Sequence, residues 1–361
     1  MEHTEKEKSP KKKRWLKVLL IILASILLLA VLAVVIAGAF VGKFLNLINK
    51  VDGTESTMSM SEYEEFMKNN TEAYDPTYDG EVMGEEDVTW DTEPELIDSG
   101  PNIINILLIG SDTRDPGVRS RSDTMILCTL NKKAKTLTLT SFMRDMYVQI
   151  PGYSANRINV PYLLGGMDLL NRTLEINFGI QVDGNFAVEF DSFMDVIDSI
   201  GGVTIYLTKA EADYMNSGRY NGYGLLPVKP RVYVEGANYM TGAEALGYSR
   251  IRVLDSDFGR TQRQRNVLTA IFNKCKTLSV AQLYKLMEEV LPMLTTNMDN
   301  MTILGYAAQA APLLSGLTLQ TQRIPVDGSF QSVMINEMAV LVPNMATNQQ
   351  VLREILSDET P

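Results

Sequence analysis

The sequence predicts a mixed α/β fold, in which a central mixed β-sheet is flanked by helices and is preceded by one transmembrane helix. Three observations predict this arrangement. Residues 18–41 form an apolar run that is long enough to cross a bilayer. Residues 102–109 form a short, almost wholly apolar run between Pro101 and Gly110, which is typical of a buried central strand. Strand-like and amphipathic helical patterns then interleave irregularly as far as residue 358.

The apolar run 18–41 predicts a membrane anchor. Its 24 residues exceed the roughly 20 that span a bilayer core. A basic stretch, residues 11–14, stands just before it, which places the tail 1–17 in the cytoplasm and the following residues outside. A cleaved signal peptide is the alternative, but its apolar core would normally have only about 7–15 residues. We therefore expect a single-pass cell-membrane protein with an extracellular domain.

Residues 42–99 differ in composition from the rest of the chain. Within residues 51–99, Asp and Glu are abundant and Lys68 is the only basic residue. This composition predicts an acidic extracellular stalk that is extended by its own charge repulsion. Trp90 and several tyrosines are available to pack part of it on the domain. The outer domain is expected to cover residues 100–358.

The rare histidine and cysteine residues exclude several chemistries. The only histidine, His3, lies in the predicted cytoplasmic tail, so the outer domain has no Ser-His-Asp or Cys-His mechanism and no His-ligated zinc. Cys128 and Cys275 both lie in apolar surroundings and read as buried core thiols. A disulfide between them is the alternative in an oxidising exterior.

The predicted elements follow from local patterns. Strands are expected at the apolar or alternating runs 102–109, 124–130, 136–142, 147–150, 203–207 and 317–325. Asp168 and Asp191 are expected to cap helices that end at Gly179 and Gly201, and residues 241–244 fit a capping box. Further amphipathic helices are expected at 257–276, 279–291, 299–314 and 347–357.

Residues 248–264 hold an arginine cluster within an acidic chain of net charge −11. Asp255 and Asp257 stand between its members, which are Arg250, Arg252, Arg260 and Arg263. Guanidinium groups suit phosphate, because the planar fork donates two parallel hydrogen bonds to two oxygens. The cluster indicates a polyanionic ligand such as pyrophosphate, and a solvated helix face is the alternative.

Charged residues also follow or precede three of the predicted strands. These places are residues 110–114, which contain Asp112, residues 121–124, which contain Arg121 and Asp123, and the pair Arg144 and Asp145. Ligands of α/β proteins commonly bind at strand ends. A solvated loop would explain any one of these places, but their repetition favours a common site.

Five segments in order resemble the LytR–CpsA–Psr family of cell-wall glycopolymer transferases. They read NILLIGSDTR, RSRSDTMIL, SFMRDMYVQIPG, RINVPYLLGG and ALGYSRIRVLDSDFGRTQRQ. The resemblance covers about residues 100–358, and Met143 stands where the family usually has proline. It implies a mixed sheet flanked by helices that binds a polyprenyl pyrophosphate in an apolar channel. It also implies transfer of a teichoic acid, capsule or similar glycopolymer from undecaprenyl pyrophosphate onto peptidoglycan, in a bacterial, Gram-positive cell membrane.

The resemblance carries roles over to individual residues. Asp112 and Asp123 match the acidic pair that holds Mg²⁺, with Mn²⁺ as the alternative ion, and hard carboxylate oxygens suit either ion. The arginines that grip the pyrophosphate are matched by Arg121, Arg144, Arg250, Arg252 and Arg260. Gln264 matches a polar headgroup contact, and Arg263 lies on nearly the same side of that helix.

The remaining charged residues receive supporting or surface roles. Asp257 is expected to orient arginines, Asp145 to pair with an arginine, and Arg265 to lie on the surface. The apolar helices within 159–200 and 265–315 are expected to supply the lipid channel, and ordinary core packing is the alternative reading of their stripes.

The implied chemistry is phosphoryl transfer, with Asp112, Asp123 and Arg144 as the catalytic set. Attack of a sugar hydroxyl on the sugar-linked phosphorus expels polyprenyl phosphate, and fixed positive charge stabilises the developing negative charge. The general base stays open. A polyprenyl-pyrophosphate binding protein without turnover and a pyrophosphatase are the alternatives. A transcriptional regulator is disfavoured, because no helix-turn-helix pattern is visible and the cytoplasmic tail is short. No nucleic-acid partner is expected.

Overall fold

The protein is represented by a computed structural model that describes residues 42–51, 57–69, 81–90, 94–111, 119–217 and 232–358. The chain divides into two compact units, Met1–Leu47 and Ile48–Pro361. In the first unit, residues 42–45 are helical, and the predicted transmembrane run 18–41 lies outside the described residues. Among the helices that are described, none combines the length and the apolarity needed to cross a membrane.

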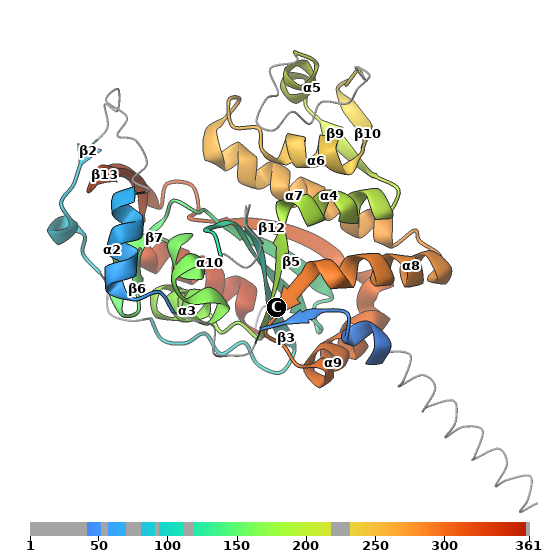
Figure 1. Ribbon diagram of the computed structural model, residues 1–361, viewed down its shortest axis with the longest axis horizontal. Helices are drawn as coiled ribbons and strands as arrows, with labels where there is room; N and C mark the ends of the chain where they lie inside the picture. Colours follow the sequence, from blue (N-terminus) through green and yellow to red (C-terminus); the bar gives the residue numbers. More distant parts are fainter. Residues whose placement is uncertain are drawn as a thin grey trace, which may run out of the picture. The chain divides into compact units, whose positions relative to one another are not determined.

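The second unit is built on a seven-stranded mixed sheet with the strand order β1-β11-β8-β3-β4-β5-β12 (Figure 1). Its central strands are β3 (Ile103–Ser111), β4 (Ser122–Asn131) and β5 (Thr136–Phe142), which form an antiparallel meander. β8 (Gly184–Glu189) pairs parallel to β3, and β12 (Thr318–Ile324) pairs parallel to β5. The predicted mixed sheet is confirmed, although β8 was missed.

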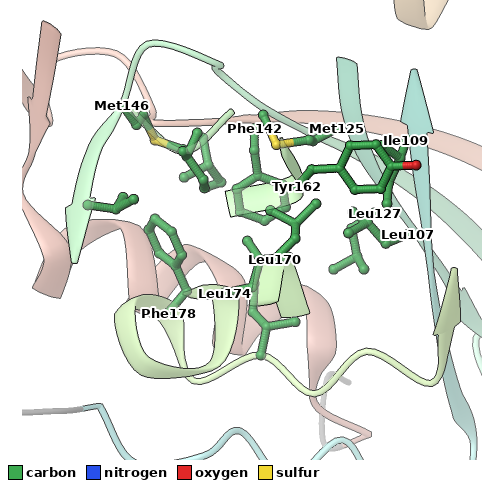
Figure 2. Close-up of a cluster of buried hydrophobic side chains, with 14 of the residues drawn as sticks. Leu107, Ile109, Met125, Leu127, Phe142, Met146, Tyr162, Leu170, Leu174 and Phe178 are labelled. Atoms are coloured by element: carbon green, nitrogen blue, oxygen red, sulfur yellow. The ribbon is translucent and has the colours of Figure 1, made fainter. Parts of the chain in front are cut away.

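One face of the sheet is covered by α3 (Val160–Phe178) and α10 (Met345–Leu356). Figure 2 shows Leu170 of α3 near Leu107 and Leu127 of the sheet. Phe178 of α3 packs on Phe142 of β5, with ring centroids 5.6 Å apart. These side chains are fully or almost fully buried. Burial of each contributes about 1.5–3 kcal/mol to folding, so this face is the main core.

The start of α3 differs from the expectation. α3 joins two helical stretches across a kink, and the first stretch, which begins at Val160 with a proline in its first turn, was not expected. Gly165 and Gly166 are non-helical, with φ/ψ of −147/24 and 64/−152, and interrupt it as a kink. The second stretch follows the glycine pair and ends at the C-cap Gly179, as expected for the helix beginning near Asp168.

The opposite face carries α4 (Phe190–Ser199), α6 (Gly242–Ser249), α7 (Ser256–Cys275) and α8 (Val280–Val290). Figure 1 shows α4, α6 and α7 close together, on the side away from α3 and α10. The predicted capping box at Thr241 is confirmed, since its side chain accepts from the amide of Glu244. The expected cap at Asp191 is wrong, because α4 already begins at Phe190 and its N-cap is Glu189.

A second apolar cluster lies where α6 and α7 meet the antiparallel pair of β9 (Val203–Leu207) and β10 (Gly236–Met240). α5 (Lys209–Asn216) follows β9 and begins with a capping box at Thr208. Cys275 packs at the margin of this cluster, and both Cys275 and Cys128 are free thiols.

Smaller elements complete the second unit. β6 (Tyr147–Ile150) pairs with β7 (Tyr153–Arg157), and β13 (Phe330–Ile335) pairs with β14 (Met338–Pro343). α9 (Asn300–Ala310) stands between β11 (Leu294–Thr296) and β12 in the chain.

Described parts of the predicted stalk are folded against the domain. β1 (Asn49–Lys50) pairs with β11, and β2 (Glu81–Val82) pairs with β13. α2 (Met60–Asn69) buries Tyr63 in the main core. Trp90 stacks on Tyr147 with ring centroids 5.9 Å apart, so the aromatic residues of this acidic segment provide its packing.

Replacement of Trp90 by alanine is expected to destabilise the protein by about 2 kcal/mol, because a half-buried indole loses its apolar contacts and its stacking partner. Chemical denaturation of the full chain measures this change. Thr89→Ala at the exposed neighbouring position is the matched control. Equal stability of the two variants would show that this segment does not contribute to the domain.

Candidate functional site

The candidate site lies at the edge of the sheet where β3, β5, β8 and β12 end and β4 begins. Ser122 at the start of β4 donates from its amide and from its hydroxyl to the carbonyl of Asn159, at 3.1 and 3.3 Å. The amide of Met143, just after β5, donates to the carbonyl of Ile324 at 2.9 Å. These bonds fix the strand ends on which Asp123 and Arg144 are carried.

Arginine and aspartate side chains alternate along this edge. Nη1 of Arg144 donates to Oδ1 of Asp123 at 2.7 Å, and its Nε lies 3.5 Å from Oδ2 of Asp145. Asp145 in turn lies 3.6 Å from Nε of Arg157, which donates from Nη2 to the carbonyl of Ala339 at 2.9 Å. The structure thus brings Asp123, Arg144 and Asp145 together, with Asp145 between two arginines.

Arg157 was missed in the sequence, although it begins the fourth resembling segment. Its side chain is only 8% exposed, whereas those of Asp123 and Arg144 are 25% and 17% exposed. Arg157 therefore lies on the buried side of the row, and Asp123 and Arg144 lie on its more exposed side. The signal that could have found it is an arginine at the end of β7 immediately before the buried Ile158.

Arg121 immediately precedes β4 and is partly buried. Its guanidinium lies over the ring of Phe66 on α2, 5.8 Å from the ring centroid, in cation–π geometry. A residue of the predicted stalk therefore contacts an arginine of the candidate site. Asp112 lies outside the described residues, so the structure places only one member of the expected carboxylate pair.

The arginines near α6 and α7 have different environments. Arg250 forms the C-cap of α6 and is half-buried, Arg252 is exposed in the following turn, and Arg260 on α7 is buried. Gln264, one helical turn after Arg260, lines an apolar cavity together with Gly110 and Thr124. This shared lining places α7 over the end of β3 and the start of β4, where Asp123 lies.

Arg263 is engaged by protein groups rather than presented to a ligand. Its Nε donates to Glu211 at 2.8 Å, and Nη1 donates to the carbonyl of Ile251 at 3.0 Å. Nη1 and Nη2 also donate to the two carboxylate oxygens of Asp255, both at 2.8 Å. The side chain is 3% exposed. These bonds give Arg263 a structural role and replace the ligand contact expected from the sequence.

Arg265 is buried, which corrects its expected place on the surface. It is 4% exposed, and its burial, together with the nearby positive charge of Arg323, lowers its pKa to about 10. Nη2 donates to Gln262, while Nε and Nη1 are buried without a hydrogen-bond partner among the described residues. The helical spacing alone did not reveal this environment, because Arg323 belongs to the distant strand β12. The side chain of Asp257 lies outside what the structure describes.

An apolar cavity of about 250 Å³ leads away from the charged edge. Its floor is the sheet, through Leu108, Ile126 and Val188, and its walls include Phe193 of α4 and Leu268 of α7. Residues 159–178 were expected to contribute to the lipid channel, but none of them lines this cavity. The apolar side chains of α3 instead pack in the core on the other face of the sheet.

A smaller polar cavity of about 240 Å³ adjoins the apolar one, since Val188 lines both. Its lining includes Ser111, Arg119, Glu189 and Ser192. Together the two cavities place an apolar pocket and a polar, charged pocket on either side of one strand end, which suits a ligand with a hydrocarbon part and an anionic part.

Among the described residues, the candidate site offers few side chains that could bind a metal ion. Among them, no group of three or more carboxylate, cysteine or histidine side chains is gathered as a metal site. Asp123 offers one hard carboxylate that is 25% exposed. This donor fits Mg²⁺, which commonly takes one or two carboxylates and completes its shell with water and phosphate.

Comparisons with known proteins identify similar chains and similar folds. Polyisoprenyl-teichoic acid–peptidoglycan teichoic acid transferase TagT of Bacillus subtilis (strain 168) is 30% identical over 284 residues, covering 78% of this chain and 77% of TagT. The solved structure described as TagT bound to LI-WTA superposes with a TM-score of 0.56 at 28% identity, covering 72% of this chain and 91% of that one.

A further solved structure has a lipid in its description. It is the LytR-CPS2A-psr family protein YwtF (TagT) with bound octaprenyl pyrophosphate lipid, with a TM-score of 0.52 and 26% identity, over 72% of this chain and 90% of that one. The profile of the LytR_cpsA_psr family matches residues 56–355, and the match begins within the segment predicted as a stalk. The chain belongs to the LytR_cpsA_psr family.

Proposed function

We propose that this chain is a membrane-anchored phosphotransferase that moves a glycopolymer from undecaprenyl pyrophosphate onto peptidoglycan. The observation that carries the proposal is the apolar cavity that ends at Gly110, Thr124 and Gln264, beside the charged row of Asp123 and Arg144. A prenyl chain fits the first part and a pyrophosphate the second. The relatives named above are a teichoic acid transferase and a protein with bound octaprenyl pyrophosphate, which supports this assignment.

The arginines bind and orient the pyrophosphate in this proposal. Arg144 presents its partly exposed guanidinium at the strand ends, and Asp145 and Arg157 hold it there. Four further arginines are proposed to bind the same pyrophosphate, namely Arg121, Arg250, Arg252 and Arg260. A preorganised positive site of this kind stabilises the charge that develops in phosphoryl transfer without reorganising at the moment of reaction.

The transferred group is the glycosyl phosphate. The acceptor hydroxyl forms a new P–O bond to the sugar-linked phosphorus and loses its proton, and the bond to the bridging oxygen breaks, which releases polyprenyl phosphate. Asp123 and Asp112 would hold Mg²⁺, which neutralises charge on the phosphate oxygens when bound. Teichoic acid is the glycopolymer favoured by the relatives, and a capsule polymer is the other candidate.

The test uses the full chain in detergent, with a polyprenyl-pyrophosphoryl saccharide, Mg²⁺ and peptidoglycan fragments, followed by mass spectrometry of both products. A phosphodiester-linked adduct that is lost with EDTA and with Arg252→Ala supports the transferase. Release of free glycosyl phosphate would identify a pyrophosphatase. Tight binding of the lipid without any product, for several glycans and acceptors, would identify a binding protein.

Asp123→Asn is expected to raise the Mg²⁺ concentration needed for half-maximal transfer by about tenfold or more, because a neutral amide oxygen is a poorer ligand for a hard cation. The amide oxygen can still accept from Arg144, so the fold should survive. A Mg²⁺ titration of initial rates measures the effect. Asp213→Asn on the exposed face of α5 is the control, and an unchanged titration for Asp123→Asn would refute the ligand role.

A further inference from the structure

A second apolar cavity continues along the same face of the sheet. It has a volume of about 270 Å³ and lies over Ile104, Ile106 and Cys128, with Ile303 and Tyr306 of α9 on its other side. Side chains two residues apart on a strand point to the same face. Gly110 and Leu108 line the first cavity and Ile106 and Ile104 line the second, so the two follow one another along β3.

Phe186 lies between the two cavities and lines both of them. It belongs to β8 and pairs with Leu108 of β3. Its side chain is only partly buried, and it is absent from the packed apolar clusters of the described residues. A ring that faces a cavity on each side lacks the close packing that fixes core side chains in a single rotamer.

The helix α9, which forms one wall of the second cavity, is exposed to solvent on its other side. No described residue of α9 is buried, and Leu304 and Met301 on this helix are 38% and 76% exposed. Cys128 on the opposite side keeps accessible surface, although burial raises its pKa to about 12. Cys128 is part of the lining of this cavity.

We propose that Phe186 divides one prenyl-binding tunnel into a proximal chamber and a distal chamber and sets the preference for chain length. This inference rests on the proposed function. Short prenyl chains end before the ring, whereas longer chains turn the ring aside and enter the distal chamber over Cys128. The six-residue separation of Ile104 from Gly110 corresponds to about 20 Å of strand, and an extended isoprene unit of four chain bonds covers about 5 Å. About four units therefore reach the far end.

The first test compares geranyl and geranylgeranyl pyrophosphate, which have two and four isoprene units, by calorimetry with the full chain in detergent. Phe186→Trp is expected to weaken the binding of geranylgeranyl pyrophosphate about tenfold more than it weakens the binding of geranyl pyrophosphate. The larger ring takes some space from the proximal chamber for both ligands, but it also closes the way into the distal chamber, which only the longer ligand uses. Phe193→Ala is the matched control. Phe193 lines the proximal cavity but not the distal one, so its replacement should weaken the binding of both ligands to the same extent.

The second test does not depend on a variant of Phe186. In a Cys275→Ser background, Cys128 is alkylated slowly at alkaline pH with an apolar maleimide, and the adduct is measured by mass spectrometry. Geranylgeranyl pyrophosphate should protect Cys128, and geranyl pyrophosphate should not. Protection by both ligands or by neither would overturn the division at Phe186.

The two tests also separate this inference from the proposed function. Binding of geranyl pyrophosphate that is lost in Arg144→Ala supports the pyrophosphate site, whatever happens at Phe186. If that binding persists without Arg144, or if neither ligand binds the wild-type chain, the pyrophosphate assignment and the tunnel both fail. If binding depends on Arg144 but Phe186→Trp weakens both ligands equally, only the chain-length inference fails.

Discussion

Replacing Arg144 with alanine is expected to reduce glycopolymer transfer by at least about 100-fold, because a fixed donor to developing negative charge commonly contributes this much. The fold should remain intact. Asp123 and Asp145, which both pair with Arg144, are 25% and 23% exposed, so water can solvate both carboxylates once the guanidinium is gone. Initial rates of adduct formation, measured with the purified variant at its own saturating substrate concentration, give the effect.

Arg144→Lys provides the informative comparison for this prediction. Lysine keeps the charge but lacks the planar fork that can bind Asp123 and a phosphate at once, so an intermediate loss is expected. Lys209→Ala, which removes an exposed ion pair on α5, controls for a general effect of lost positive charge. A folded Arg144→Ala protein that transfers at the wild-type rate would remove Arg144 from the catalytic set.

Replacing Arg263 with alanine is expected to cost about 3–5 kcal/mol of folding stability, because it leaves a buried carboxylate without its partner. Glu211 is only 8% exposed, so water cannot readily replace the guanidinium there. The apparent melting temperature should fall by roughly 10 °C. Thermal and chemical unfolding of the purified variant measure this loss.

A double-mutant cycle separates the ion pair from the packing of the long side chain. Arg263→Met, Glu211→Gln and the double variant form the cycle, and the double variant should be more stable than the sum of the single changes predicts. Arg252→Ala is the matched control, since Arg252 is exposed and should leave stability unchanged. Normal stability of Arg263→Ala combined with weak ligand binding would restore the role expected from the sequence.

The central strands could be predicted because their signals are local. β3, β4 and β5 are apolar or alternating runs, and the turn of polar residues after Asn131 joins two of them. β8 was missed because its six residues run directly into α4, and Asn185 and Glu189 dilute its apolar character. β1 and β11 have too few residues to produce any pattern, and only their pairing in space makes them strands.

The same distinction applies to the site. Asp123 and Arg144 could be expected to meet, because an antiparallel pair brings the start of β4 beside the end of β5. Arg263 and Arg265 stand two residues apart on α7, and both are buried for reasons that lie elsewhere in the chain. Glu211 on α5 holds one of them, and Arg323 on β12 acts on the other. A helical wheel of α7 predicts neither of these contacts, because both partners lie on other elements.

The order of strands in the sheet also determines when the sheet can be completed during folding. The meander β3-β4-β5 joins neighbours in the chain and can form early, because closing short loops costs little entropy. β11 and β12 come late in the chain yet lie on opposite sides of that meander, next to β8 and β5. Asn49, near the start of the second unit, pairs with Thr295. A growing chain therefore carries unpaired edges on both sides of its sheet until residues 294–324 have been synthesised, which is the period when it is most open to aggregation.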